Sequence, residues 1–199
     1  LSISHNPLKN RKIQKFWKSH EEEFFEGKAE LPCGEIVCPS DYIHLFYLLH
    51  HAFRHLISGG IGLRQMMDIY FAFLHRDAGM DARLMHDVED MGMTRFASAT
   101  MWVLRTVFAL PEIPSLWNAD ESEGQFLLNE IMAGGNFGHG DTRFRHPTSR
   151  AGKLVEIARR NLHLLSHYES DALVAPFYYI WHFFWKRIQI CRMWFRRRD

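Results

Sequence analysis

The chain has 199 residues, of which 47% are hydrophobic and 24% are charged. This is the balance of a globular protein and excludes a disordered one, and the length suffices for one sizeable core, so we expect one domain. The formal net charge of +1 excludes an overall electrostatic footprint for nucleic acid. Basic residues gather only locally, at 9–18 and 192–198.

The cysteine content predicts a reducing compartment. Cys33, Cys38 and Cys191 are odd in number, and the first two lack the second pair that would complete a zinc site. The longest apolar run, 175–185, is shorter than the roughly 20 residues of a membrane span. We therefore expect a cytoplasmic protein without a transmembrane segment.

Apolar residues recur at helical spacing along most of the chain. The predicted fold class is all-α, a multi-helix bundle of about seven helices with at most a short β-like arm near residues 30–38. The helices are expected at 7–26, 41–58, 63–75, 81–91, 94–109, 120–133, 147–168 and 176–197. No internal repeat is present.

The helix at 41–58 is the most clearly amphipathic. Ser40 is the expected N-cap, and the Gly59-Gly60 pair is expected to end the helix. Its apolar residues form one face: Tyr42, Leu45, Phe46, Leu49, Ala52, Phe53 and Leu56. On the other side, at 100° per residue, lie His44, His51 and His55.

The next helix, 63–75, is expected to pair antiparallel with 41–58. The residues predicted to face inward are Leu63, Met66, Met67, Tyr70, Phe71 and Leu74. Arg64 and Asp68 share the opposite face, one turn apart. This helical hairpin gathers more titratable groups than a core requires.

Three interpretations of the histidines stay open. They are surface groups, or they form a phosphate- or substrate-binding face, or His51 and His55 hold a metal ion together with Asp68. The last would make the protein a metal-dependent hydrolase. The glutamate that follows the first histidine of a metalloprotease motif is replaced by Ala52.

Arg64 lies in the first turn of the predicted helix 63–75, directly after a glycine-rich segment. Backbone N–H groups and a guanidinium at such a place can hold an anion, with Asp68 orienting the guanidinium. The alternative is a surface ion pair worth under ~1 kcal/mol. The glycine-rich segment 134–141 has the same two interpretations, a phosphate cradle or a helix C-cap with an irregular turn.

The last predicted helix, 176–197, combines many aromatic residues with arginines. It suits packing inside the chain, a membrane interface, nucleic-acid bases or a partner domain. A helical interaction or scaffold module is therefore the second function that we consider.

Three segments together resemble the uncharacterised bacterial nucleotidyltransferases of the polymerase-β-like superfamily. They are the run 6–12, then His51-Ala52-Phe53-Arg54-His55 leading into Gly60-Ile61-Gly62-Leu63-Arg64-Gln65-Met66-Met67-Asp68, and finally Gly135-Asn136-Phe137-Gly138. The resemblance implies transfer of a nucleotidyl group from a nucleoside triphosphate to an unknown acceptor, with Mg²⁺ as cofactor.

The metal-binding carboxylates of that superfamily belong to an Asp-x-Asp pair after a Gly-Ser turn, and neither pattern occurs in this chain. We therefore expect residues 1–199 to be a helical C-terminal region that is not catalytic alone, with the catalytic domain upstream. No catalytic or metal residue is assigned. The resemblance implies that His51, His55, Arg64 and Asp68 bind nucleotide or acceptor, and it leaves a homo-oligomer open.

Overall fold

The computed structural model describes residues 7–134, 150–168 and 174. By backbone proximity the chain divides into two compact units, residues 11–143 in one and residues 1–10 with 144–199 in the other. The predicted helix at 176–197 and the glycine-rich segment after Gly134 lie outside the described residues. We consider each unit by itself.

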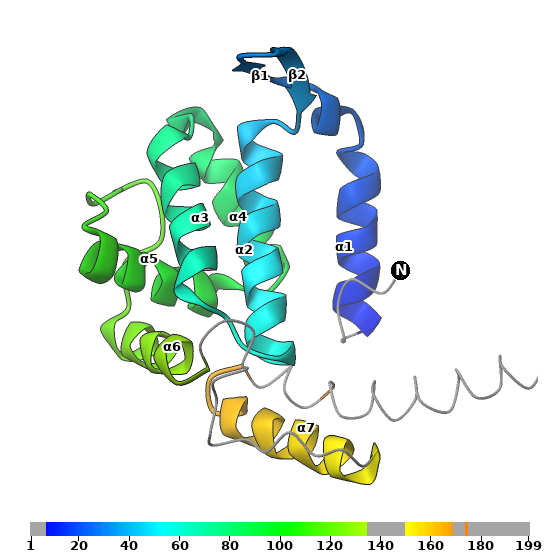
Figure 1. Ribbon diagram of the computed structural model, residues 1–199, viewed down its shortest axis with the longest axis vertical. Helices are drawn as coiled ribbons and strands as arrows, with labels where there is room; N and C mark the ends of the chain where they lie inside the picture. The colour runs from blue at the N-terminus through cyan, green and yellow to red at the C-terminus, as the bar shows by residue number, and fades with distance from the viewer. Residues whose placement is uncertain (1–6, 135–149, 169–173, 175–199) are drawn as a thin grey trace, which may run out of the picture. The chain divides into compact units, whose positions relative to one another are not determined.

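The described part of the chain is mostly helical, as predicted (Figure 1). Its helices are α1 (Pro7–Ser19), α2 (Asp41–Ser58), α3 (Leu63–His75), α4 (Asp81–Asp90), α5 (Thr94–Phe108), α6 (Glu121–Gly134) and α7 (Arg150–Leu164). Two short 3-10 helices, η1 (Glu22–Phe25) and η2 (Ala78–Met80), precede β1 and α4. The α7 helix belongs to the smaller unit.

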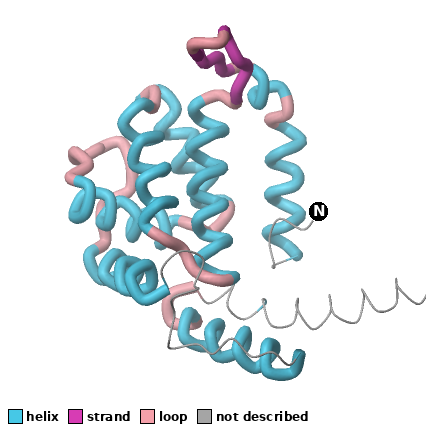
Figure 2. The backbone as a smooth tube through the Cα atoms, viewed as in Figure 1, coloured by secondary structure: helices cyan, strands magenta, loops and turns pink. Residues whose placement is uncertain are grey.

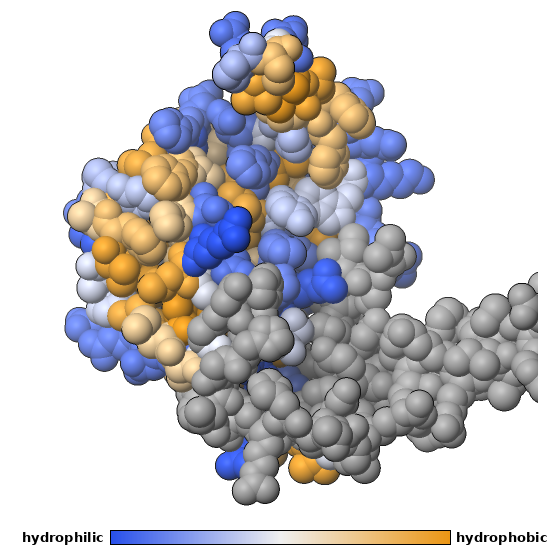
Figure 3. Space-filling model, in the orientation of Figure 1, coloured by the Kyte–Doolittle hydropathy of each residue, from blue (hydrophilic) through white to orange (hydrophobic). Residues whose placement is uncertain are grey.

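The predicted β-like arm is a two-stranded antiparallel hairpin of β1 (Gly27–Leu31) and β2 (Gly34–Cys38). Leu31 pairs with Gly34, and Gly34 adopts a φ of +128°, which favours glycine. The hairpin lies on the connection between α1 and α2 (Figure 2). Much of its apolar surface is exposed, with Val37 at 58%, and Figure 3 shows hydrophobic side chains on it.

The first helix is shorter than predicted: α1 ends at Ser19 rather than at Glu26. The Ser19 hydroxyl donates a hydrogen bond to the Phe16 carbonyl at 3.0 Å, and His20 Nδ1 lies 2.7 Å from the same oxygen. Side chains that bond to a local carbonyl compete with continued helix. Glutamates 21–23 are also unfavourable at a helix C-terminus, where the dipole favours cations.

The core of the larger unit confirms the predicted face of α2. All seven of its predicted inward residues are buried. Phe46 stacks on Phe16 of α1 with ring centroids 4.0 Å apart, and Phe53 contacts Phe96 of α5 at 5.3 Å. The α2 helix is thus held between α1 and the α3–α5 side of the unit (Figure 1).

The predicted inward face of α3 is wrong. Met66 is buried as expected, but the other fully buried residues are Ile69 and Phe73. Of the remaining predicted residues Tyr70 is half-buried, and the others are exposed by 38–51%: Leu63, Met67, Phe71 and Leu74. Apolar residues surround α3 on nearly every side, so their spacing does not decide which side packs against α2 and α5.

Candidate functional site

The turn between α2 and α3 sets the geometry of the candidate site. The backbone N–H groups of Gly59 and Gly60 both donate to the His55 carbonyl, at 2.9 and 2.7 Å. Gly60 adopts a φ of +115°, which side chains rarely tolerate. The Gly62 N–H then donates to Gln65 Oε1 at 3.0 Å, so the first turn of α3 is capped by its own glutamine.

His51 and His55 lie side by side on the last turns of α2. Their Nε2 atoms are 3.0 Å apart, a hydrogen-bond distance, and the rings meet edge to face with centroids 4.4 Å apart. One ring donates a hydrogen bond from its Nε2–H and the other accepts it at an unprotonated Nε2, so only one ring of the neutral pair carries Nε2–H. Both rings are half-buried.

Burial and charge both keep this pair neutral. Desolvation lowers the pKa of His51, and the Arg54 guanidinium lowers it further. The pKa of His55 is lowered by desolvation first, then by His51 and by Arg54. Arg54 is exposed on the same helix. Sequence reasoning missed Arg54, although its place between the two histidines puts it within one turn of each.

Arg64 and Asp68 are exposed on α3, as predicted. The ion pair considered from their spacing is absent, since neither residue takes part in a salt bridge within the described ranges. The arginine lies N-terminal to the aspartate, the less favourable order for a pair four residues apart. Arg64 is therefore not oriented by Asp68.

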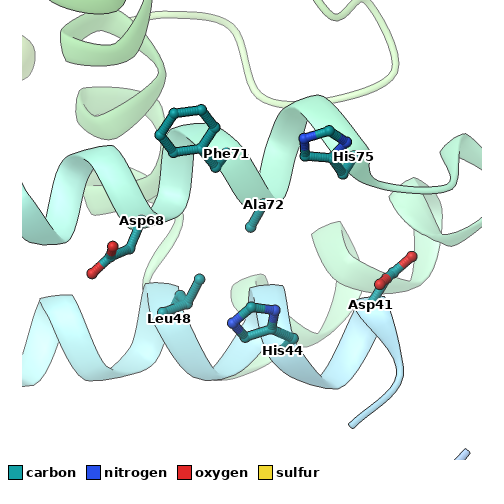
Figure 4. A pocket seen from close by; sticks show the side chains of 7 residues that line it. All are labelled: Asp41, His44, Leu48, Asp68, Phe71, Ala72 and His75. Carbon is teal, nitrogen blue, oxygen red and sulfur yellow. The ribbon is translucent and has the colours of Figure 1, made fainter. Parts of the chain in front are cut away.

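A cleft of about 460 Å³ runs between α2 and α3 (Figure 4). It brings Asp68 and His44 together, and it adds side chains that the sequence did not indicate as site residues. The lining consists of Asp41, His44 and Leu48 from α2 with Asp68, Phe71, Ala72 and His75 from α3. His51, His55 and Arg64 are not part of this lining.

The antiparallel pairing of the two helices explains the composition of the cleft. Asp41 and His44 are in the first turns of α2, whereas His75 is the last residue of α3. The sequence signal for the missed residues was the three- and four-residue spacing of positions 68, 71, 72 and 75, which puts them on one side of α3. In the structure this side faces α2 across the cleft.

The residues considered for a metal ion do not assemble. Within the described part of the chain, no three side chains of histidine, cysteine, aspartate or glutamate lie close enough together to hold a metal ion. His51 and His55 bond to each other, and Asp68 lies in the cleft without them. The arrangement does not favour a metal-dependent hydrolase.

A second polar cluster of the larger unit has a structural role. The Tyr42 hydroxyl donates to Asp87 Oδ2, the Arg83 guanidinium lies 3.9 Å from the Tyr42 ring centroid, and Arg83 also binds Glu23. Burial is the main cause that raises the pKa of Tyr42, with the Asp87 hydrogen bond second. These groups satisfy one another and join η1, α2 and α4.

Comparison with known proteins adds one match. A family model described as uncharacterised nucleotidyltransferase matches residues 2–109, a span that contains α1 to α5 and therefore the whole α2–α3 hairpin. No curated protein and no solved structure matches the chain. Among the described helices, none has both the length and the apolar character needed to cross a membrane.

Proposed function

The chain belongs to the uncharacterised nucleotidyltransferase family, and we propose that its α2–α3 hairpin forms one wall of the nucleotide- and acceptor-binding cleft of such an enzyme. In that reaction an acceptor hydroxyl attacks the α-phosphorus of a nucleoside triphosphate. A new P–O bond forms, the bond to pyrophosphate breaks, and the hydroxyl proton is lost to a base.

The cationic end of the hairpin is the observation that carries this proposal. Arg54 and Arg64 are exposed beside the turn, and the histidine pair lies on the same part of α2. Within the described ranges Arg64 has no carboxylate partner, so its planar guanidinium can form paired hydrogen bonds with a phosphate. A bound triphosphate would raise the pKa values that Arg54 and burial now lower.

The metal ion that the family implies does not fit the described residues. Mg²⁺ prefers oxygen ligands and a near-octahedral arrangement, usually with one or two carboxylates and substrate phosphates. The two carboxylates of the cleft, Asp41 and Asp68, lie at its opposite ends (Figure 4). We therefore propose that the carboxylates of a metal centre come from residues outside the described ranges, as a separate catalytic domain would supply.

In this proposal residues 1–199 supply binding rather than chemistry. His51, His55 and Arg64 bind the phosphates, and Asp68 faces the acceptor. The helical interaction module, the second function considered, depended mainly on the helix predicted at 176–197, which lies outside the described residues.

Nucleotide affinity tests the proposal. Arg64→Ala in the intact protein should weaken the binding of a nucleoside triphosphate by about tenfold or more, because one charge-assisted contact is worth roughly 1.5–3 kcal/mol. Arg105→Ala, which removes an exposed arginine from α5, is the control. Calorimetric titration measures both. Unchanged affinity and turnover in Arg64→Ala would refute this role of the hairpin.

A further inference from the structure

The cleft differs in chemistry from the cationic end of the same hairpin. Among the described residues, its charged lining side chains are the carboxylates Asp41 and Asp68, and no lysine or arginine lines it. The two carboxylates give the lining a formal negative charge. A phosphate would be repelled from these walls, whereas a cation would be attracted.

We infer that this cleft binds an organic amine with at least two protonated amino groups. The inference rests on the proposed function for one step: where the bound amine also carries a hydroxyl, as an amino sugar does, that hydroxyl is the acceptor of the nucleotidyl group. Recognition of the amine itself requires only the cleft.

The first support is that the polar side chains of the cleft are available. Within the described ranges, the side chains of the four titratable lining residues take part in no hydrogen bond or ion pair with another residue. Elsewhere in the same unit carboxylates are engaged, as Asp81 is with Arg76 at 2.9 Å. The two cleft carboxylates therefore keep their full capacity to accept hydrogen bonds from a ligand.

Phe71 gives the second support. Its side chain is 51% exposed although it is large and apolar, and it lines the same cleft as the two carboxylates. An ammonium group near an aromatic ring is attracted by the ring face, and the methylene groups of an amine bury apolar surface there. Leu48 and Ala72 complete this apolar part of the lining.

The spacing of the carboxylates selects the ligand. Asp41 precedes Leu48 by seven residues, roughly 10 Å along a helix, and Figure 4 shows Asp68 at the Leu48 end of the cleft. A single metal ion cannot bind both groups at once, and no metal-binding cluster exists in the described part. A linear polyamine or an amino sugar with separated amines can contact both.

Calorimetric titration of the full chain with spermidine and with neamine, an amino sugar that carries four amino groups, tests the inference and separates these two sources. N-acetylglucosamine, which lacks the charged amine, is the ligand control. We expect saturable binding of at least one amine and no binding of the acetylated sugar. Binding of spermidine alone assigns a linear polyamine, and binding of neamine alone assigns an amino sugar with separated amino groups. Binding of neither, or equal binding of the acetylated sugar, would overturn the inference.

Charge-neutralising variants locate the amine. Asp68→Asn and Asp41→Asn should each weaken amine binding at least fivefold, whereas Glu89→Gln, which removes one exposed carboxylate from α4, should not. Equal losses in all three would mean non-specific attraction and would overturn the inference. Circular dichroism checks that each variant is folded, and Asp68→Asn alone suffices if Asp41→Asn weakens α2.

The two proposals fail separately. Arg64→Ala should leave amine binding unchanged, because Arg64 does not line the cleft. If no amine binds while Arg64→Ala still lowers nucleotide affinity, the nucleotide proposal stands and the acceptor class is wrong. If amines bind but Arg64→Ala leaves nucleotide affinity unchanged, the amine site stands and the nucleotide proposal is wrong.

Discussion

The surroundings of His51 and His55 on α2 favour the neutral form of both imidazoles when no ligand is bound. A charged imidazole at this place would lose solvation and would face Arg54, so the folded state binds protons less readily than the unfolded chain does. The negative charge of a bound polyanion would oppose both effects, because it favours the protonated imidazole. The same two residues therefore connect stability, pH and ligand charge.

Stability should fall on acidification because of this pair. The folded pKa values lie below the ordinary value of about 6.5, so the neutral pair stabilises the fold fully above that pH and progressively less as pH falls toward the folded values. Urea unfolding at pH 7.5 and 5.5 measures this loss. The double variant His51→Gln/His55→Gln should lose less stability between the two pH values than the natural chain.

His86→Gln, which removes an exposed imidazole from α4, is the control for losing a histidine elsewhere. If the double variant shows the same pH dependence as the natural chain, the pair does not titrate as its surroundings require.

At the scale of elements, α3 has two apolar sides, of which one is buried and the other is exposed. The side with Met66, Ile69 and Phe73 is buried, and the side with Met67 and Phe71 is open to solvent. Only the first contributes a full core contact, while the second contributes Phe71 to the lining of the cleft.

Substitution separates these two sides. Phe73→Ala should destabilise the fold by about 3–5 kcal/mol, because it removes a fully buried aromatic side chain and leaves a cavity. Phe71→Ala should cost under about 1 kcal/mol, since half of its side chain is already exposed. Chemical denaturation measures both. Similar losses in the two variants would show that α3 packs on its other side.

The sequence correctly predicted the ends of α2 and α3 but not the buried face of α3. Ser40 accepts the Ile43 N–H at 3.4 Å as its cap, Gly59 ends α2, and α3 has the predicted bounds. These are local signals that depend on neighbours in the chain. The face of α3 depends on which helices surround it, and so spacing alone could not identify it.

The candidate site shows the same limit. Helical spacing correctly put His51 beside His55, because both lie on one helix. It could not show that Asp68 joins His44 and His75 rather than the histidine pair, since that depends on how α2 and α3 align.

At the scale of the larger unit, the hairpin is held by ties on several sides. Tyr42 bonds to Asp87 of α4, and the buried Asp81 accepts bonds from both Arg76 and Ser115. These contacts fix both helices that line the cleft, and a fixed wall binds with less ordering cost than a loose one. The region that matches the nucleotidyltransferase family contains all of α2, α3 and α4.

Histidine NMR during a nucleotide titration tests the central claim most directly. With imidazole nitrogens labelled in the intact protein, a nucleoside triphosphate should shift the His51 and His55 resonances toward the protonated form, while His86 on α4 stays unchanged. Saturable binding that leaves the His51 and His55 signals in place would contradict the assignment of the α2–α3 hairpin to the nucleotide.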